Sequence, residues 1–326
     1  MSGPAGVSRG RLALPGQTCT VAGSEPAGPL HHRRILVTGG CMFGADRLTD
    51  NGSTMGRAGQ TNPPATVAVV EAVSTMAGRF AELVESAPNP DMAVPATPDW
   101  SVTDVFGHVA MEPSRYRELA LGRGDWPSRV VDLPAFNAAQ IRSLPTRDVA
   151  ELAATLRADT DALLATASGF GEDPPLMNFD GDQRVRADRA LGTLLGEYVV
   201  HGHDIARALG RPWPIDPAHV PMIMEGLHQV LPGWVNPANA AGHNATYEMR
   251  LRGYARYVYQ FRNGQLTVNP PEPGRIDVHI VADPITALLL NYGRISQWKP
   301  ALTGRVFAWG RRPWLGVGFA RRFHPA

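Results

Sequence analysis

The chain has 326 residues, of which 44% are hydrophobic and 19% charged, so it is long and apolar enough for two domains with separate cores. Its 31 lysines and arginines nearly balance 30 aspartates and glutamates, which leaves a formal charge of +1. A chain without a large positive field does not attract nucleic acid or an anionic membrane surface. We therefore expect small-molecule partners.

The sequence lacks two kinds of feature, and their absence limits the expected location of the protein and its chemistry. No apolar run reaches the roughly 20 residues of a membrane-spanning helix, and the N-terminus lacks the apolar centre of a signal peptide, which predicts a cytoplasmic protein. Both cysteines, Cys19 and Cys41, precede the region that we expect to fold. This excludes a disulfide framework, a zinc–thiolate site and a cysteine nucleophile in the folded region.

Residues 1–63 are rich in Gly, Pro, Ser, Thr and Arg and show no sustained apolar period, so we expect a disordered N-terminal extension. Within it, residues 34–40 look like the first strand and glycine turn of a nucleotide-binding domain. The glycines are misspaced for that motif, and no helix with a second strand follows. We interpret this similarity as chance. Met55 offers an alternative start of translation.

Apolar side chains recur at the helical period over residues 64–240, and this pattern predicts a helical bundle. The expected helices start near Pro64, run from Ser101 through His108 toward Leu121, start near Thr146, run from about Asp188 to Leu209, and cover Pro217 to Leu231. Ser101 and Asp104 have the spacing of a capping box at the start of the second helix. A long connection separates the second helix from the third.

After about Ala245 the period changes to that of strands, which predicts a small α+β domain over residues 246–326. Strands are expected at 247–251, 257–261, 266–268, 275–281 and 304–309, with an apolar helix at 284–292 and a terminal helix. Asn263-Gly264 favours a tight hairpin between the second and third of these strands. The predicted fold class is therefore a two-domain α+β protein.

The segment around Glu197 carries the strongest chemical signal. On a helix, Glu197 and His201 lie one turn apart on the same face, and Asp204 lies one turn further along. One carboxylate and two imidazoles suit Zn, Ni, Mn or Fe(II), with positions left for water or substrate, and we favour zinc. His108 is the best third ligand, because apolar neighbours place it on the core-facing stripe of another bundle helix.

Each of these residues also has a structural interpretation. His108 taken alone is more often a hydrogen-bonded core histidine, and Glu197 with His201 could be an exposed pair that supports the helix. The flanking apolar residues argue against the second alternative, because an unpaired buried carboxylate costs several kcal/mol unless a cation neutralises it.

Four nearby residues are assigned by their position along the chain. Asp204 is either a fourth ligand or, as we prefer, an acceptor that orients His201 or a water. His203 is expected to be a surface or packing residue. Asp99 and Glu112 are expected to be solvated and to have no role.

Three motifs resemble known families. Pro98–His108 resembles the second-helix motif of DinB-like metal-binding bundles, and Glu197–Ala206 is similar to the fourth-helix motif of the mycothiol-dependent maleylpyruvate isomerase family. Gly304–Trp314 resembles that family's C-terminal domain, which is sterol-carrier-protein-like. Matched by position, the resemblance implies metal ligands at His108, Glu197 and His201 and a DinB-like four-helix bundle of up-down-down-up topology. It spans nearly everything from about Pro64 onward.

The resemblance implies mycothiol as the source of a thiol, because the region expected to fold has no cysteine. A metal with three protein ligands can bind a thiol and lower its pKa. In the family's reaction the thiolate adds to a conjugated cis double bond, rotation follows, and elimination yields the trans isomer. We therefore expect an isomerase or S-transferase that acts on a small electrophile or an unsaturated acid, and no particular oligomeric state is predicted.

Two further hypotheses concern the C-terminal domain. Arg311 or Arg312 could reach over the metal and bind the carboxylate of an acidic substrate, although a solvated arginine pair is an equal alternative. The second hypothesis is a non-catalytic small-ligand carrier, in which the metal is structural and the apolar helix containing Ile285 and Leu288–Leu290 lines the ligand pocket.

Overall fold

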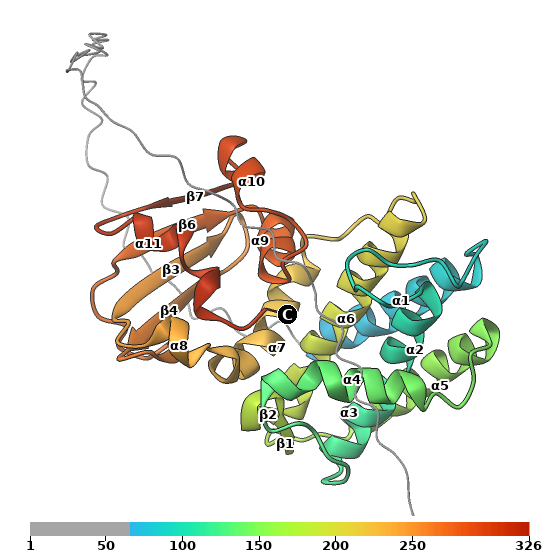
Figure 1. Ribbon diagram of the computed structural model, residues 1–326. Coiled ribbons are helices and arrows are strands. Elements are labelled where there is room, and N and C mark those ends of the chain that lie inside the picture. The colour runs from blue at the N-terminus through green and yellow to red at the C-terminus, as the bar shows by residue number, and fades with distance from the viewer. Residues whose placement is uncertain (1–65, 326) are drawn as a thin grey trace, which may run out of the picture. The chain divides into compact units, whose positions relative to one another are not determined.

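The computed structural model describes residues 66–325, in which a helical N-terminal part is followed by a C-terminal part built on a sheet (Figure 1). This confirms the predicted α+β fold class. The two parts lie in one compact unit, and the domain boundaries at 240 and 246 stay a prediction. The predicted extension 1–63, with its glycine-rich segment and Met55, lies outside the described residues.

Helix α6 is the longest element of the helical part and packs against both α1 and α7. The helices of this part are α1 (Thr66–Glu85), α2 (Val102–Ala110), α3 (Glu112–Ala120), α4 (Leu133–Arg142), α5 (Val149–Ser168), α6 (Ala187–Ala208) and α7 (His219–Val230). Phe80, Phe106 and Tyr198 meet in the core, with ring centroids 5.4 and 6.3 Å apart. Burying each such ring stabilises the fold by roughly 1.5–3 kcal/mol. No helix among residues 66–325 is long and apolar enough to cross a membrane.

The start of α2 is built as predicted, but its end is not. Ser101 Oγ accepts from the Asp104 amide at 3.1 Å, and an Asp104 carboxylate oxygen accepts from the Ser101 amide at 2.9 Å, so the capping box is confirmed. The predicted continuation to Leu121 is wrong, because α2 ends at Ala110 and α3 begins at Glu112. Pro113 explains the break, since proline has no amide hydrogen for the preceding turn and is tolerated only in the first turn of a helix.

Other differences lie in the connections. The third predicted helix is α5, which begins at Val149 after its cap residue Asp148 rather than near Thr146. The long connection before it contains α4 and the 3₁₀ turn η1 (Val130–Asp132), and a hairpin of β1 (Leu176–Phe179) and β2 (Gln183–Arg186) with the turn η2 (Asp180–Asp182) precedes α6. These elements are short and carry few apolar residues, so their periodicity is weak.

The C-terminal sheet has the strand order β5-β4-β3-β6-β7, in which β3 and β6 are parallel and the other neighbours antiparallel. Its strands are β3 (Ala245–Leu251), β4 (Arg256–Arg262), β5 (Gln265–Val268), β6 (Val278–Ala282) and β7 (Val306–Trp309). Asn263 and Gly264 have φ angles of 49° and 84°, as a tight two-residue hairpin requires.

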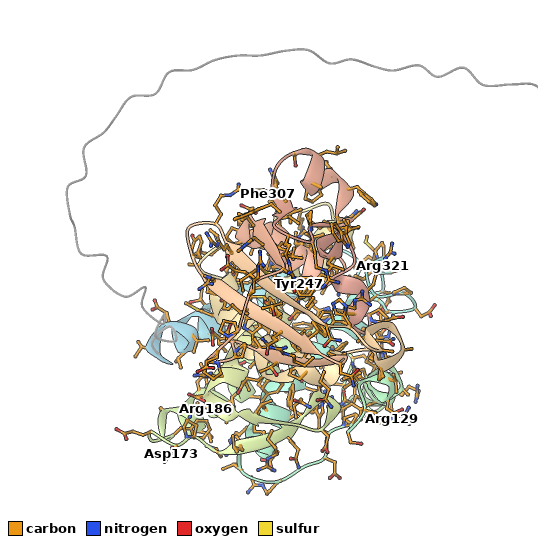
Figure 2. The ribbon with its side chains drawn as sticks, turned by 90° about the vertical axis from the view of Figure 1, so that its left-hand side faces the viewer. Arg129, Asp173, Arg186, Tyr247, Phe307 and Arg321 are labelled. Carbon is orange, nitrogen blue, oxygen red and sulfur yellow. The ribbon has the colours of Figure 1, made fainter. Side chains whose placement is uncertain are left out.

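The remaining elements cover one face of this sheet or connect its strands. They are η3 (Leu231–Trp234), α8 (Pro237–Ala240), α9 (Pro284–Asn291), α10 (Trp298–Leu302), α11 (Trp314–Val317) and η4 (Ala320–Arg322). On the covered face, the hydroxyl of Tyr259 lies 2.8 Å from His228 Nε2 of α7, and Phe319 contacts the rings of Tyr247 and Tyr259. Figure 2 shows the labelled Tyr247 in the middle of the sheet part.

The close crossing of α6 and α7 depends on glycine. A Cβ at Gly226 would lie 2.3 Å from the backbone nitrogen of Thr193, whereas a Cβ at Gly78 in α1 would meet nothing within 4 Å. We expect Gly226→Ala to lower the free energy of unfolding by about 1–3 kcal/mol, since the two backbones must move apart. The control Gly78→Ala should raise it by about 0.5–1 kcal/mol through helix propensity. Urea unfolding measures both, and equal effects would contradict the packing argument.

Candidate metal centre

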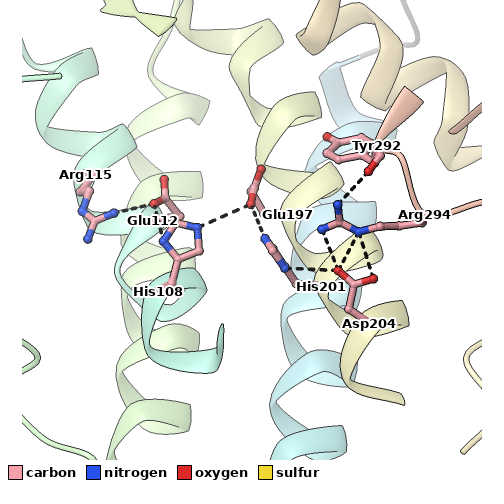
Figure 3. A network of polar contacts seen from close by, with 8 residues as sticks. All are labelled: His108, Glu112, Arg115, Glu197, His201, Asp204, Tyr292 and Arg294. Atoms are coloured by element: carbon pink, nitrogen blue, oxygen red, sulfur yellow. Dashed lines mark hydrogen bonds and ion pairs between the residues drawn. The ribbon is translucent and has the colours of Figure 1, made fainter. Parts of the chain in front are cut away.

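Two helices bring the three predicted metal ligands together. His108 comes from α2 and Glu197 and His201 from α6, and one ligand atom from each lies within 4.8 Å of the others (Figure 3). His201 Nε2 is 3.2 Å and His108 Nε2 3.9 Å from the same oxygen, Glu197 Oε2. The two imidazole rings are nearly perpendicular, at 85°. Both rings therefore present Nε2 to one carboxylate oxygen.

The spacing of these atoms fits a metal ion. Three donors that bind one tetrahedral zinc ion at about 2.1 Å lie roughly 3.4 Å from one another. The 3.2 and 3.9 Å separations at Glu197 Oε2 are close to this value. A divalent ion could thus be held after small side-chain movements.

A carboxylate lies behind each imidazole. Glu112 Oε1 is 3.8 Å from His108 Nδ1, and Asp204 Oδ2 is 3.7 Å from His201 Nδ1. Both Nδ1 atoms are buried, and neither has a hydrogen-bond partner in the structure. Carboxylates in this position commonly accept the second ring N–H of a metal-bound histidine and fix its orientation. Asp204 therefore lies where the preferred prediction puts it, close behind His201.

The prediction for Glu112 is wrong. This residue was expected to be solvated, but it is buried, with 3% of its surface exposed. The helix break before Pro113 puts Glu112 at the start of α3, where its carboxylate pairs with Arg115 at 2.5 Å. Burial raises the pKa of Glu112 to about 8, against the lowering effect of Arg115. Asp99 is exposed, as expected.

The C-terminal part contributes an arginine that sequence reasoning missed. Arg294, which follows α9, has Nη2 2.8 Å from Asp204 Oδ2 and donates from Nε to both oxygens of that carboxylate. Its Nη1 donates to the carbonyl oxygen of Tyr292 at 2.7 Å. Arg294 therefore anchors the sheet part to the helix that carries two of the three donors. Its position directly after a predicted apolar helix was the signal that could have found it.

Tyr292 also approaches the cluster. Its hydroxyl is buried without a partner, and a Cβ at Gly196 would lie 2.5 Å from it. Glycine beside Glu197 thus makes room for this ring. Burial raises the pKa of Tyr292 well above its usual range, so the hydroxyl remains protonated and able to donate.

Arg311 is not the arginine beside this cluster. Its guanidinium pairs with Asp277, the residue before β6, and its side chain is 52% exposed. Arg312 donates to the carbonyl oxygen of Asn244 at 3.0 Å. The two arginines follow β7 at an edge of the sheet, whereas Arg294 follows α9 and contacts α6. Tertiary packing therefore decides which arginine lies beside the cluster.

The protonation states favour cation binding. Burial and the neighbouring His201 lower the pKa of His108 to about 3, so its ring is neutral at neutral pH. Burial tends to raise the pKa of Glu197, but His201, His108 and Arg294 outweigh this effect and lower it. Glu197 is therefore ionised. A neutral imidazole and an ionised carboxylate are the forms that bind a metal ion.

A third buried carboxylate links the helical part to the chain leading into the sheet. Asp180 Oδ1 accepts from Trp126 Nε1 at 2.6 Å, and Oδ2 accepts from Trp234 Nε1 at 2.9 Å. Burial raises the pKa of Asp180 from 3.8 to about 6, despite the lowering effect of both indoles. Nothing in the local sequence of the β1–β2 turn indicated this burial.

The raised pKa of Asp180 gives a prediction for stability. The folded protein holds this proton more tightly than the unfolded chain, so the contribution is fully present below pH 3.8 and is lost as pH rises through about 6. Relative to Asp180→Asn, the metal-free wild type should lose up to about 3 kcal/mol of unfolding free energy between about pH 4 and pH 7. Urea unfolding at a series of pH values measures this difference. A difference independent of pH would contradict the buried carboxylate.

A His–Glu–His cluster between two helices, in which His108 is buried and Glu197 and His201 are half-buried, defines a candidate metal-binding helical bundle. Residues 71–206 match the mycothiol maleylpyruvate isomerase N-terminal domain family, and this span contains all three donors. The match begins within α1 and ends within α6, so it lies wholly in the helical part of the chain. No curated protein matches the sequence.

Several solved structures are similar to this chain. A mycothiol-dependent maleylpyruvate isomerase shares 16% identity over 74% of this chain and 91% of its own, with a TM-score of 0.46. A histidine-to-alanine mutant of such an isomerase shares 14% identity over 75% and 93%, with a TM-score of 0.44. YfiT from Bacillus subtilis, to which metal-dependent hydrolysis has been ascribed and which has an unusual four-helix bundle topology, shares 16% over 49% and 96%, with a TM-score of 0.37.

The ligand assignment is tested by metal content. Separate His108→Ala, Glu197→Ala and His201→Ala variants should each lose bound metal, because two remaining donors bind weakly. His203→Ala is the matched control, since this histidine lies on the same helix outside the cluster and should leave the metal content unchanged. Elemental analysis of the purified proteins measures the outcome. Equal loss in all four variants, or in none, would reject the assignment.

Proposed function

We propose that this chain is a mycothiol-dependent metalloenzyme that activates the cofactor's thiol for cis–trans isomerisation of a small unsaturated acid or for S-transfer to a small electrophile. One observation carries the proposal: His108, Glu197 and His201 converge within 4.8 Å in a domain of the mycothiol maleylpyruvate isomerase family. We expect small molecules as its partners.

The donor set suits a divalent ion, with zinc favoured. His108, Glu197 and His201 would hold the ion, which would supply Lewis-acid chemistry that can lower the pKa of a thiol bound to it. Residues 66–325 contain no cysteine, so the sulfur has to come with a cofactor. The family name makes mycothiol the first choice.

The chain's own residues then have distinct tasks. His108 and His201 point Nε2 toward Glu197, while Glu112 and Asp204 lie behind their Nδ1 atoms, where a carboxylate can orient a metal-bound imidazole. Arg294 forms an ion pair with Asp204 and lowers the pKa of the nearby Glu197, so it helps to keep that donor ionised. The unpartnered Tyr292 hydroxyl is a donor that can hold a carboxylate or carbonyl oxygen.

Cobalt substitution tests the thiol step directly. Titrating mycothiol into the cobalt-loaded protein should produce a sulfur-to-cobalt charge-transfer band, because the thiolate enters the open position. S-methylated mycothiol is the matched control and should produce no such band. Tightly held cobalt without any thiol-dependent change would instead favour a structural metal in a non-catalytic carrier.

A further inference from the structure

The sheet has a second face that is not part of the metal centre. On the covered face Tyr247, Tyr259 and Phe261 are each at most 1% exposed. On the opposite face the strand register aligns two rows of side chains across β4, β3, β6 and β7. The first row is Val258, Glu248, His279 and Trp309, and the second is Arg256, Arg250, Val281 and Phe307. We call this set the open face.

A buried carboxylate organises the charged half of the open face. Glu248 is 1% exposed and accepts hydrogen bonds from Nε of both Arg250 and Arg256. A third contact joins it to His279 Nδ1 at 2.9 Å. Burial raises the pKa of Glu248, but these three partners outweigh that effect and lower it to about 2. Glu248 is therefore an ionised anchor that fixes both guanidinium groups.

The two arginines retain unused donors. Arg250 and Arg256 are direct cross-strand neighbours, an arrangement of like charges that is unfavourable unless it is compensated. Glu248 compensates one of the two charges, so the group keeps a net positive charge. The arginine side chains are 50% and 57% exposed, and their η-nitrogens have no hydrogen-bond partner within residues 66–325. Each guanidinium group therefore keeps η-nitrogens that can donate hydrogen bonds to a bound ligand.

The other half of the open face is aromatic. Trp309 stacks on His279, with ring centroids 4.1 Å apart and an interplanar angle of 18°. Phe307 and Trp309 are 47% and 46% exposed, and Figure 2 shows Phe307 near the top of the sheet part. They belong to the edge strand β7, two strands from β3, which is a separation of about 10 Å.

We propose that the open face binds an organic anion that carries an oxyanion group and an aromatic or other apolar part. The η-nitrogens of Arg250 and Arg256 receive the oxyanion, because paired guanidinium forks match the geometry of a carboxylate or phosphate. The apolar part lies on Phe307 and Trp309, whose exposed ring surface is removed from water on binding.

The charge of the open face selects this occupant over a second copy of the chain. Two copies would bring like positive charges together, whereas an anion neutralises the surplus charge. The site is independent of the proposed metal chemistry, since its residues come from β3, β4, β6 and β7 and none is a predicted metal ligand.

The test uses 2-naphthyl phosphate with the full chain in calorimetric titration, and inorganic phosphate and 2-naphthol as its separate halves. We expect the ester to bind at least about tenfold more tightly than either half, because only the ester reaches both halves of the face. Arg250→Gln and Trp309→Ala should each weaken its binding by about tenfold. Trp309→Ala leaves the partners of Glu248 in place and so tests the site even if Arg250→Gln unfolds.

Matched controls locate the binding. Arg262→Gln removes an exposed arginine at the far end of the same strand as Arg256, and Trp314→Ala removes a tryptophan that is 64% exposed in α11. Both should leave the affinity unchanged. Absence of binding by the wild type, equal affinity for inorganic phosphate, equal loss in control and test variants, or binding only to phosphatidic acid vesicles would overturn the proposal.

Discussion

The burial of several acidic side chains around one helix is the constraint on which the site depends. The carboxylates of Glu112, Asp180, Glu197 and Asp204 lie in or beside the packed region around α6, and the guanidinium groups paired with them are those of Arg115 and Arg294. The pKa values of Glu112 and Asp180 rise to about 8 and about 6, so these groups hold protons that an exposed carboxyl would release. A divalent cation held by His108, Glu197 and His201 would balance the charge of the ionised Glu197, so the cluster is a candidate metal centre.

Local structure sets the direction of each donor. The capping box at Ser101 fixes the start of α2 and so determines which face carries His108. Glu112 follows His108 by four residues, the spacing that brings two side chains together on one helical face, and its Oε1 lies 3.8 Å from His108 Nδ1. On α6 the one-turn spacing of Glu197 and His201 needs no tertiary help. The three donors therefore come from two helices: His108 from the short helix α2, and Glu197 and His201 from the long helix α6.

The sheet part contributes residues to two separate candidate sites. Through Tyr292 and Arg294 it reaches the helical part and places a positive charge and a hydroxyl donor beside the cluster. Through the open face it presents a fixed pair of arginines next to exposed aromatic rings, organised by buried Glu248. In both places a buried carboxylate holds an arginine in a defined orientation. The same arrangement thus places one arginine beside the candidate metal centre and two at the candidate anion site.

Features that depend on neighbouring residues were determined by the sequence itself. The period of the apolar residues separated the helical part from the sheet part, Asn263-Gly264 specified a hairpin, and the spacing of Glu197 and His201 put two donors on one helical face. Tertiary structure alone decided that Glu112 is buried, that Arg294 rather than Arg311 approaches the cluster, and that β3 and β6 pair in parallel. Arg294 and Asp204 are 90 residues apart along the chain. Such a contact follows from how whole elements pack, which no local period or spacing encodes.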